Sequence, residues 1–212
     1  MENPITFSPQ NTGDVVQSRK ERRALNRTRL LRTGAEFLSQ QSYAATGVDQ
    51  IIAHAGLTKG TFYHYFVSKE QFALEVVDLY ANYFNQRLDA YLLNDATDPL
   101  ERLSGYVSDS IRSLERDNFK RSCLVGNLSQ ELGAQDSALV PALEAALAGW
   151  QRRVAACLRQ AQARAEVASH LDAEELSAFF WMGWEGALLQ AKLLKRAEPL
   201  SLFFKQFSMR LQ

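Results

Sequence analysis

The segment from Thr46 to Phe72, TGVDQIIAHAGLTKGTFYHYFVSKEQF, decides the fold of this 212-residue chain. Its first apolar residues follow the i, i+3, i+4, i+7 spacing of a helix with one buried face: Val48, Ile51, Ile52 and Ala55. Thr46 followed by Asp49 predicts a capping box, in which two side chains satisfy free backbone N–H groups at the start of a helix. We therefore expect a short helix that begins just after Thr46.

The rest of the segment predicts a turn and two further helices. Gly56 stands where a tight turn requires a positive φ. Thr58 can cap a second short helix that runs to about Phe66, and Ser68 with Gln71 predicts another capping box. This capping box predicts the start of a long helix over residues 69–92. Two short helices joined by a turn of about three to four residues are typical of a helix-turn-helix.

Helical spacing continues on both sides of this segment. We expect further helices over residues 22–41, 99–116, 125–132, 141–168 and 173–195, and a last one that Pro199 opens. Only five prolines and long stretches of good helix formers indicate an all-α fold.

The length of the chain predicts a small domain joined to a larger one. Residues 1–18 mix Pro, Asn, Thr, Gln and Ser without periodicity, which predicts a disordered tail. Residues 19–70 form the helix-turn-helix domain, and residues 71–212 form a larger helical domain. Because the boundary lies inside the helix that begins at about Lys69, the two domains should be mechanically coupled.

Charge is distributed unevenly along the chain, although the net charge is zero. From Arg19 to Lys69 there are nine basic and three acidic residues, whereas residues 70–212 have fifteen basic and nineteen acidic residues. A basic N-terminal segment followed by a mildly acidic remainder of the chain is typical of a DNA-binding domain attached to a domain that does not bind DNA.

Composition argues against several other classes of protein. Cys123 and Cys157 are too few for a disulfide framework, and no Cys/His spacing suggests a metal site. We find no apolar run long enough to cross a bilayer and no secretory signal, so we expect a cytoplasmic protein without a membrane partner. No glycine loop for nucleotides, nucleophile elbow or paired acid/base signature is present, so we expect neither an enzyme nor a cofactor.

The second short helix has the surface that a DNA-reading helix needs. Phe62 and Phe66 are four residues apart and can face the core, while donors and rings occupy the other positions. The N-terminal residues of such a helix read base edges in the major groove, and neighbouring side chains fix its register on phosphates. The alternative is that Tyr63, His64 and Tyr65 pack against the domain itself.

Residues 46–72 closely resemble the helix-turn-helix of the TetR family of bacterial regulators. The resemblance implies a homodimer that binds a palindromic double-stranded DNA operator, and a C-terminal domain that senses ligands and dimerises. It also implies a DNA-facing set: Thr46, Lys59, Gly60, Thr61, Tyr63, His64, Tyr65 and Lys69.

Three segments of the C-terminal domain extend the resemblance: residues 119–133 (FKRSCLVGNLSQELG), 150–153 (WQRR) and 179–193 (FFWMGWEGALLQAKL). They resemble the acrylate-responsive repressors of the AcuR type and, more distantly, the electrophile-sensing repressors of the NemR type. The resemblance implies that acrylate or a related small carboxylate releases the protein from its operator.

Two interpretations of the sensing site follow. In the first, a pocket binds a small carboxylate without covalent chemistry, and its candidate residues are Tyr80, Arg121, Asn127, Trp181, Trp184, Glu185, Leu188 and Lys192. In the second, Cys123 is a thiol that senses electrophiles or oxidants such as quinones, aldehydes or hypochlorite. In the NemR-type pattern a cysteine at this position works with a lysine at the position of Lys192.

Simpler alternatives remain open for the same residues. Cys123 can be a buried small hydrophobe, and the tryptophans can pack in the core or at a dimer interface. Lys192 lies near a helix C-terminus, where cations are favoured regardless of function. An activator in place of a repressor, and an architectural DNA-binding protein, are the alternative functions.

Overall fold

The computed structural model describes residues 18–211, which contain nine α-helices and no strand. The helices are α1 (Arg19–Gln40), α2 (Val48–His54), α3 (Lys59–Tyr65), α4 (Lys69–Leu92), α5 (Pro99–Arg116), α6 (Leu124–Leu132), α7 (Leu139–Ala163), α8 (Ala173–Leu194) and α9 (Glu198–Met209). The all-α fold expected from the sequence is confirmed. None of the helices within this range is long and apolar enough to span a membrane.

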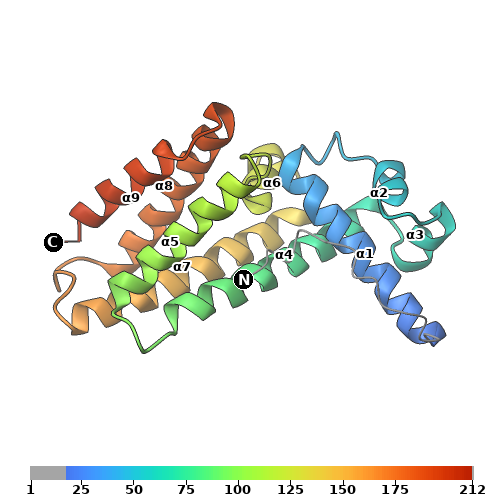
Figure 1. Cartoon of the computed structure of the whole chain (residues 1–212). Coiled ribbons are helices and arrows are strands. Elements are labelled where there is room, and N and C mark those ends of the chain that lie inside the picture. Colours follow the sequence, from blue (N-terminus) through green and yellow to red (C-terminus); the bar gives the residue numbers. More distant parts are fainter. Residues whose placement is uncertain (1–17, 212) are drawn as a thin grey trace.

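Helices α1 to α3 and the first turns of α4 form the head of the molecule, at the end away from α9 (Figure 1). Three phenylalanines fill its core: Phe62, Phe66 and Phe72 are almost fully buried, with ring centroids 4.9–5.3 Å apart. Helix α1 lies close to α4 because Gly34 has no side chain. A Cβ there would lie 2.8 Å from Val76 Cγ2. The core thus leaves the remaining positions of α3 facing outward.

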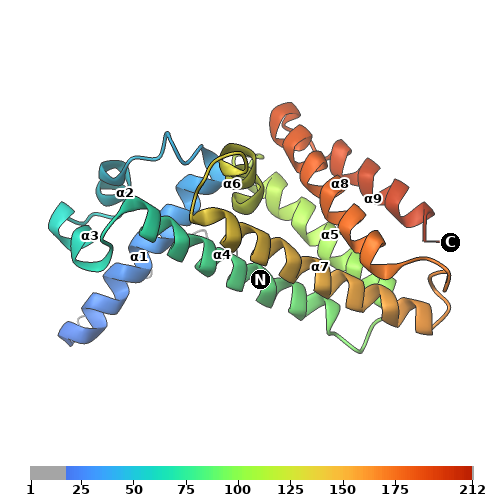
Figure 2. The same ribbon diagram turned by 180° about the vertical axis from the view of Figure 1, so that it is seen from behind.

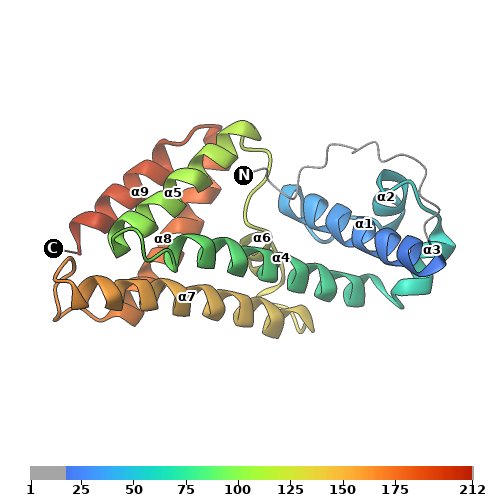
Figure 3. The same ribbon diagram turned by 60° about the horizontal axis from the view of Figure 1, so that its bottom comes forward.

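Helices α4, α5, α7, α8 and α9 form the body, with the short α6 between the body and α1 (Figure 2). Helix α4 runs from the head into the body without interruption, and α7 lies alongside it (Figure 3). Trp150 of α7 is completely buried at the centre, and Phe180 of α8 is equally inaccessible. Because α4 belongs to both parts, a shift of its body end also moves the head.

Several of the predicted helix starts are confirmed. Thr58 Oγ accepts the N–H of Thr61 at 3.3 Å, and Ser68 Oγ accepts the N–H of Gln71 at 3.0 Å. Gly56 has a φ of +63°, as the turn between α2 and α3 requires.

Two predicted capping boxes are wrong in detail. Helix α2 is capped at Gly47, whose N–H donates to Gln50 Oε1 at 3.1 Å, and not by Thr46 with Asp49. The Thr46 hydroxyl instead donates to the Ser42 carbonyl in the turn after α1. At the start of α4, Gln71 Oε1 accepts the N–H of Val67 at 2.7 Å rather than that of Ser68.

The largest difference from the predicted helix boundaries is at the end of α7. Helix α7 ends at Ala163, five residues before the predicted end, because the chain turns back through Ala165 at a φ of +60°. The Glu166 N–H then closes the turn on the Ala161 carbonyl at 2.9 Å. No glycine marks this turn, so the sequence carried no stop signal there. The disordered tail expected for residues 1–18 lies outside the described residues except for Ser18, which forms the capping box of α1 with Glu21.

Candidate DNA interface and ligand cavity

Helix α3 presents polar groups and rings on its outer face. Tyr63 is 50% exposed, and Lys59 and His64 are also exposed. A Cβ on Gly60 would meet only the Thr58 hydroxyl, at 4.0 Å, so the backbone at the start of α3 is open to close approach. This surface has the donors and the access that major-groove recognition requires.

The Lys59 side chain is paired, but only weakly. Its Nζ lies 3.1 Å from an oxygen of Asp49, and both side chains are more than half exposed. An exposed pair of this kind contributes about 0–1 kcal/mol. Lys59 can therefore exchange Asp49 for a DNA phosphate at little cost.

Thr61 and Tyr65 lie at the edge of the same surface and are both half-buried. The Thr61 hydroxyl is 2.9 Å from that of Thr58. The Tyr65 hydroxyl donates to the Arg23 carbonyl at 3.0 Å, so this ring ties α3 to α1 as well as bordering the outer face.

The structure separates Thr46 and Lys69 from this surface. Thr46 is 1% exposed and its hydroxyl is bonded within the turn after α1, which corrects the expectation that its side chain faces DNA. Lys69 Nζ donates to the Tyr43 carbonyl at 2.6 Å and lies 4.1 Å from the centroid of the Tyr43 ring. Burial lowers the pKa of Lys69, although Glu131 acts in the opposite direction. To reach a phosphate, Lys69 has to leave these contacts.

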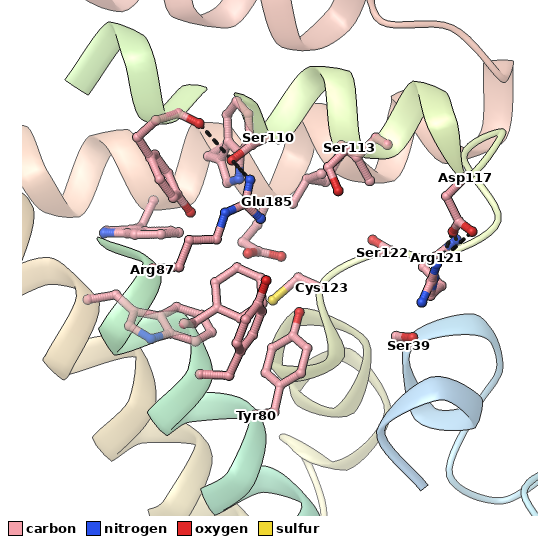
Figure 4. Close-up of a pocket in the computed structure, with 18 residues that line it drawn as sticks. Ser39, Tyr80, Arg87, Ser110, Ser113, Asp117, Arg121, Ser122, Cys123 and Glu185 are labelled. Carbon is pink, nitrogen blue, oxygen red and sulfur yellow. Dashed lines mark hydrogen bonds and ion pairs between the residues drawn. The ribbon is translucent and has the colours of Figure 1, made fainter. Parts of the chain in front are cut away.

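A cavity of about 90 Å³ lies in the body among α4, α5, α7, α8 and the segment that leads into α6 (Figure 4). Its aromatic lining is Tyr80, Tyr83, Phe84, Tyr106, Trp150, Trp181 and Trp184, with Leu188 beside them. Its polar lining is Ser39, Arg87, Ser110, Ser113, Asp117, Arg121, Ser122, Cys123 and Glu185. The cavity thus combines an apolar wall with a few polar groups, as small-molecule sites do.

Three polar groups meet in the middle of the cavity: Tyr80, Cys123 and Glu185 (Figure 4). The Tyr80 hydroxyl accepts the Leu124 N–H at 3.2 Å, and the Cys123 sulfur accepts the Gly126 N–H at 3.4 Å. Both contacts cap the start of α6. The thiol of Cys123 is also hydrogen-bonded to the carboxyl of Glu185. These groups couple the cavity wall to the first turn of α6.

Glu185 carries the most perturbed carboxyl of the cavity. The residue as a whole is half-buried, but its Oε1 atom is closed off from solvent and has no hydrogen-bond partner. Burial raises the pKa of Glu185 to about 7, and the hydrogen bond with Cys123 offsets only part of that rise. Near neutral pH the carboxyl is therefore partly protonated.

Two tryptophans that line the cavity also have unsatisfied groups. The indole N–H groups of Trp150 and Trp181 are buried and have no acceptor. An unsatisfied buried donor costs about 1–3 kcal/mol. A ligand oxygen that reached either indole N–H would recover this free energy.

Two arginines supply the cations of the cavity, and each is already paired. Arg87 donates to Asp109 at 2.9 Å and to the Ser110 hydroxyl at 3.1 Å. Arg121 forms a two-point pair with Asp117, with both distances 2.8 Å. Figure 4 shows the pair of Arg121 and Asp117 at one end of the lining, apart from Glu185.

Lys192 and Asn127 lie outside the cavity lining, which corrects the expectation that they contact a ligand there. Lys192 Nζ donates to the Gln40 carbonyl at the end of α1, at 3.1 Å. The Asn127 side-chain amide donates to the carbonyls of Leu38 and Ser39, both at 3.2 Å. Both residues hold the body against α1, because that helix end exposes free carbonyls.

The remaining predicted residues are brought together: Tyr80, Arg121, Cys123, Trp181, Trp184, Glu185 and Leu188 all line the cavity. Sequence reasoning missed the other eleven lining residues, among them Arg87, Tyr106, Ser110 and Trp150. Trp150 stood in a segment quoted for the family resemblance and could have been included. No local signal marks Arg87, since its partner Asp109 is on another helix.

The surroundings of Cys123 do not activate its thiol. Burial raises the pKa of Cys123 well above its usual value, and the charge of Glu185 acts in the same direction. The N–H of Gly126 and the Tyr80 hydroxyl favour the thiolate but do not offset burial. Lys192, the lysine of the expected pair, donates to Gln40. A reactive thiol needs solvent access and a cation that lowers its pKa, whereas Cys123 is buried and no cation is among the groups that shift its pKa.

Gly126 makes room for Glu185, which yields a testable prediction. A Cβ on Gly126 would overlap Glu185 Oε2 and lie 3.1 Å from its Cδ. Gly126→Ala should therefore lower the free energy of unfolding by about 1–3 kcal/mol, although alanine is the better helix former. In a Glu185→Ala background the same change should be neutral or should stabilise by up to about 1 kcal/mol. Denaturant unfolding of the four proteins measures this difference, and equal effects in both backgrounds would contradict it.

Among residues 18–211 no group of His, Cys, Asp and Glu side chains is arranged to hold a metal ion.

Comparison with known proteins agrees with both halves of the structure. A family model described as "Bacterial regulatory proteins, tetR family" matches residues 30–76. A second, described as "Tetracyclin repressor-like, C-terminal domain", matches residues 99–207.

Relatives match over nearly the whole chain. The transcriptional regulator AcuR of Cereibacter sphaeroides is 39% identical over 96% of this chain and 95% of its own length. The HTH-type transcriptional repressor NemR of Escherichia coli is 29% identical over 82% of this chain and 87% of its own length. The crystal structure of a regulatory protein TetR from Rhodobacter sphaeroides superposes with a TM-score of 0.86 at 40% identity, covering 89% of this chain and 100% of the other.

A helix-turn-helix head on a helical body is the architecture of a DNA-binding transcriptional regulator, the class to which the matched relatives belong. The chain belongs to the TetR family.

Proposed function

We propose that the protein is a homodimeric repressor that leaves a palindromic operator when a small carboxylate, acrylate or a close relative, occupies the cavity. The observation that carries the ligand class is the cavity itself, with a volume of about 90 Å³ and two unsatisfied indole N–H donors. A cavity of about 150 Å³ admits benzene. One of this size suits a ligand of fewer heavy atoms, and a carboxylate has the acceptor oxygens that the indole N–H groups lack.

Repression is supported by two relatives whose names describe repressors. DhaR of Mycobacterium sp. is 27% identical over 84% of this chain, and NemR of Escherichia coli is the second. In a two-fold dimer, two copies of α3 would meet half-sites about one helical turn apart, roughly 34–36 Å. The DNA-contacting residues that we propose on α3 are Lys59, Gly60, Thr61, Tyr63, His64 and Tyr65. Lys69 joins them if it releases Tyr43.

Helix α6 supplies a route from the cavity to the head. Its N-cap is Cys123, in the cavity wall. Near its other end, Glu131 accepts the N–H groups of Tyr43 at 2.5 Å and Ala44 at 2.7 Å, in the loop between α1 and α2. A ligand that shifts the start of α6 would therefore move the loop that leads into the helix-turn-helix. A ligand changes operator affinity only by its differential affinity for the two arrangements.

Thiol sensing through Cys123 is the alternative, and the geometry favours it less. The thiol is buried, its pKa is raised, and its sulfur already caps α6.

Operator release separates the two functions. We would measure release from the DNA upstream of the protein's own gene, at fixed salt, with acrylate, its saturated analogue propionate, and hypochlorite. Cys123→Ser is the matched variant, because serine is a good N-cap and keeps α6 capped. We expect acrylate to release the wild type and Cys123→Ser alike, since binding is non-covalent.

Release that requires Cys123 would establish the thiol sensor instead. If none of the three compounds releases DNA that the protein does bind, the proposed ligand class is wrong while the regulator function stands.

A further inference from the structure

The cavity proposed for a carboxylate also contains a carboxyl group of its own. Glu185 lines it, and its Oε1 atom is buried without a hydrogen-bond partner. In so small a cavity a ligand carboxylate cannot lie far from Glu185. Two unit charges about 4 Å apart at a typical protein dielectric repel enough to weaken binding by about three orders of magnitude. The two groups cannot both be charged.

The cations near the cavity are already paired with carboxylates other than Glu185. The groups that face Glu185 from neighbouring elements are Cys123 at the start of α6, Tyr80 and Arg87 on α4, Tyr106 on α5 and the uncharged Trp150 on α7. Arg87 pairs with Asp109, which it shares with Arg112, and Arg121, farther along the lining, pairs with Asp117. Within residues 18–211 Glu185 has no ion pair. The cavity wall therefore holds no cation that is paired with Glu185.

The surroundings of Glu185 favour that proton. Gly126 gives Oε2 its space against the first turn of α6, where the Cys123 thiol bonds the same carboxyl. This leaves Oε1 unbonded in the interior. Burial raises the pKa of Glu185 to about 7, so protonation near neutral pH costs little.

We propose that the cavity binds a small carboxylate only together with a proton on Glu185, so that ligand and wall do not both carry a negative charge. This inference rests on the proposed function. The ligand remains a carboxylate, and above neutral pH the proton comes from solvent. No covalent bond of the ligand changes.

The affinity of the cavity for its carboxylate ligand should therefore depend on pH, with a defined direction and size. Below pH 7 Glu185 is already protonated, and ligand affinity is independent of pH. Above pH 7 each unit of pH removes about a factor of ten, because the acid must first be protonated. Between about pH 6 and about pH 8 the apparent affinity for acrylate should fall about tenfold. Acrylate itself stays ionised across this range, since ordinary carboxyls titrate near pH 4.

Calorimetry on the full-length protein tests this directly. We would titrate acrylate at about pH 6 and about pH 8, each in two buffers of different ionisation enthalpy. The expected result is uptake of close to one proton per ligand at the higher pH and close to none at the lower. Acrylamide, an uncharged analogue of the same shape, is the control ligand, and its affinity should not change with pH. Glu185→Gln keeps a donor without a charge, so its affinity for acrylate should be equal at both pH values.

The outcomes are distinguishable. Acrylate binding by the wild type with equal affinity and no proton uptake at the higher pH would overturn the inference and leave the proposed ligand in place. Absence of acrylate binding at both pH values would overturn the ligand and the inference together. If Glu185→Gln does not fold, the proton count of the wild type decides alone.

Discussion

Leu189→Arg should convert the protein to a monomer and weaken operator binding by at least about a hundredfold. Helix α8 has exposed apolar residues spaced alternately by three and four: Phe179, Met182, Leu189 and Leu193, with Gly186 completing the series. Nothing in the protomer lies within 4 Å of a Cβ built on Gly186. Spacing of this kind forms a straight seam along a helix and is typical of helices that pair with another helix. Leu202 and Met209 on α9 are exposed in the same way.

An arginine in the middle of this seam would have to be buried without a partner upon dimerisation. The loss in operator affinity then follows from loss of bivalency, which contributes a factor of about 10²–10⁴. Light scattering gives the oligomeric state, and fluorescence anisotropy at fixed salt gives the operator affinity. The matched control is Leu93→Arg, at an exposed leucine at the end of α4 and away from the seam. A dimeric Leu189→Arg protein that still binds its operator would place the interface elsewhere.

Tyr63→Ala and His64→Ala should each weaken operator binding by about 1–3 kcal/mol, or about 5–150-fold, without unfolding the head. Both side chains are exposed on α3, and Phe62, not Tyr63, fills the core beneath them. The double variant should lose nearly all specificity while it keeps weak, salt-dependent binding to phosphates.

Anisotropy with operator and with unrelated DNA, at two salt concentrations, measures affinity and specificity separately. His170→Ala is the matched control, since His170 is an exposed histidine in the body. Thr46→Ala, by contrast, should act through stability, because the Thr46 side chain is buried. If the variants at Tyr63 and His64 bind the operator as well as wild type does, α3 is not the reading helix.

The cavity could be predicted only in part. Seven of the nine proposed sensing residues do line it, and all of them except Tyr80 come from segments that also supported the family resemblance. Lys192 and Asn127 do not, although Lys192 follows Leu188 by four residues. Helical spacing places Leu188 and Lys192 on one face of α8, but it does not say where the partner helices end. The end of α1 at Gln40 lies within reach of Lys192, and its free carbonyl takes the ammonium.

The sequence by itself determined the helix-turn-helix, the all-α class and several helix starts. These depend on residues a few positions apart: Thr58 with Thr61, Ser68 with Gln71, and the positive φ of Gly56. Only the tertiary structure decided the charges of the cavity. Arg87 meets Asp109, Glu185 occupies the space that Gly126 leaves, and both contacts join residues far apart in the sequence. Local hydrogen bonds follow from spacing along the chain, whereas the pKa of a buried carboxyl depends on which helices close around it.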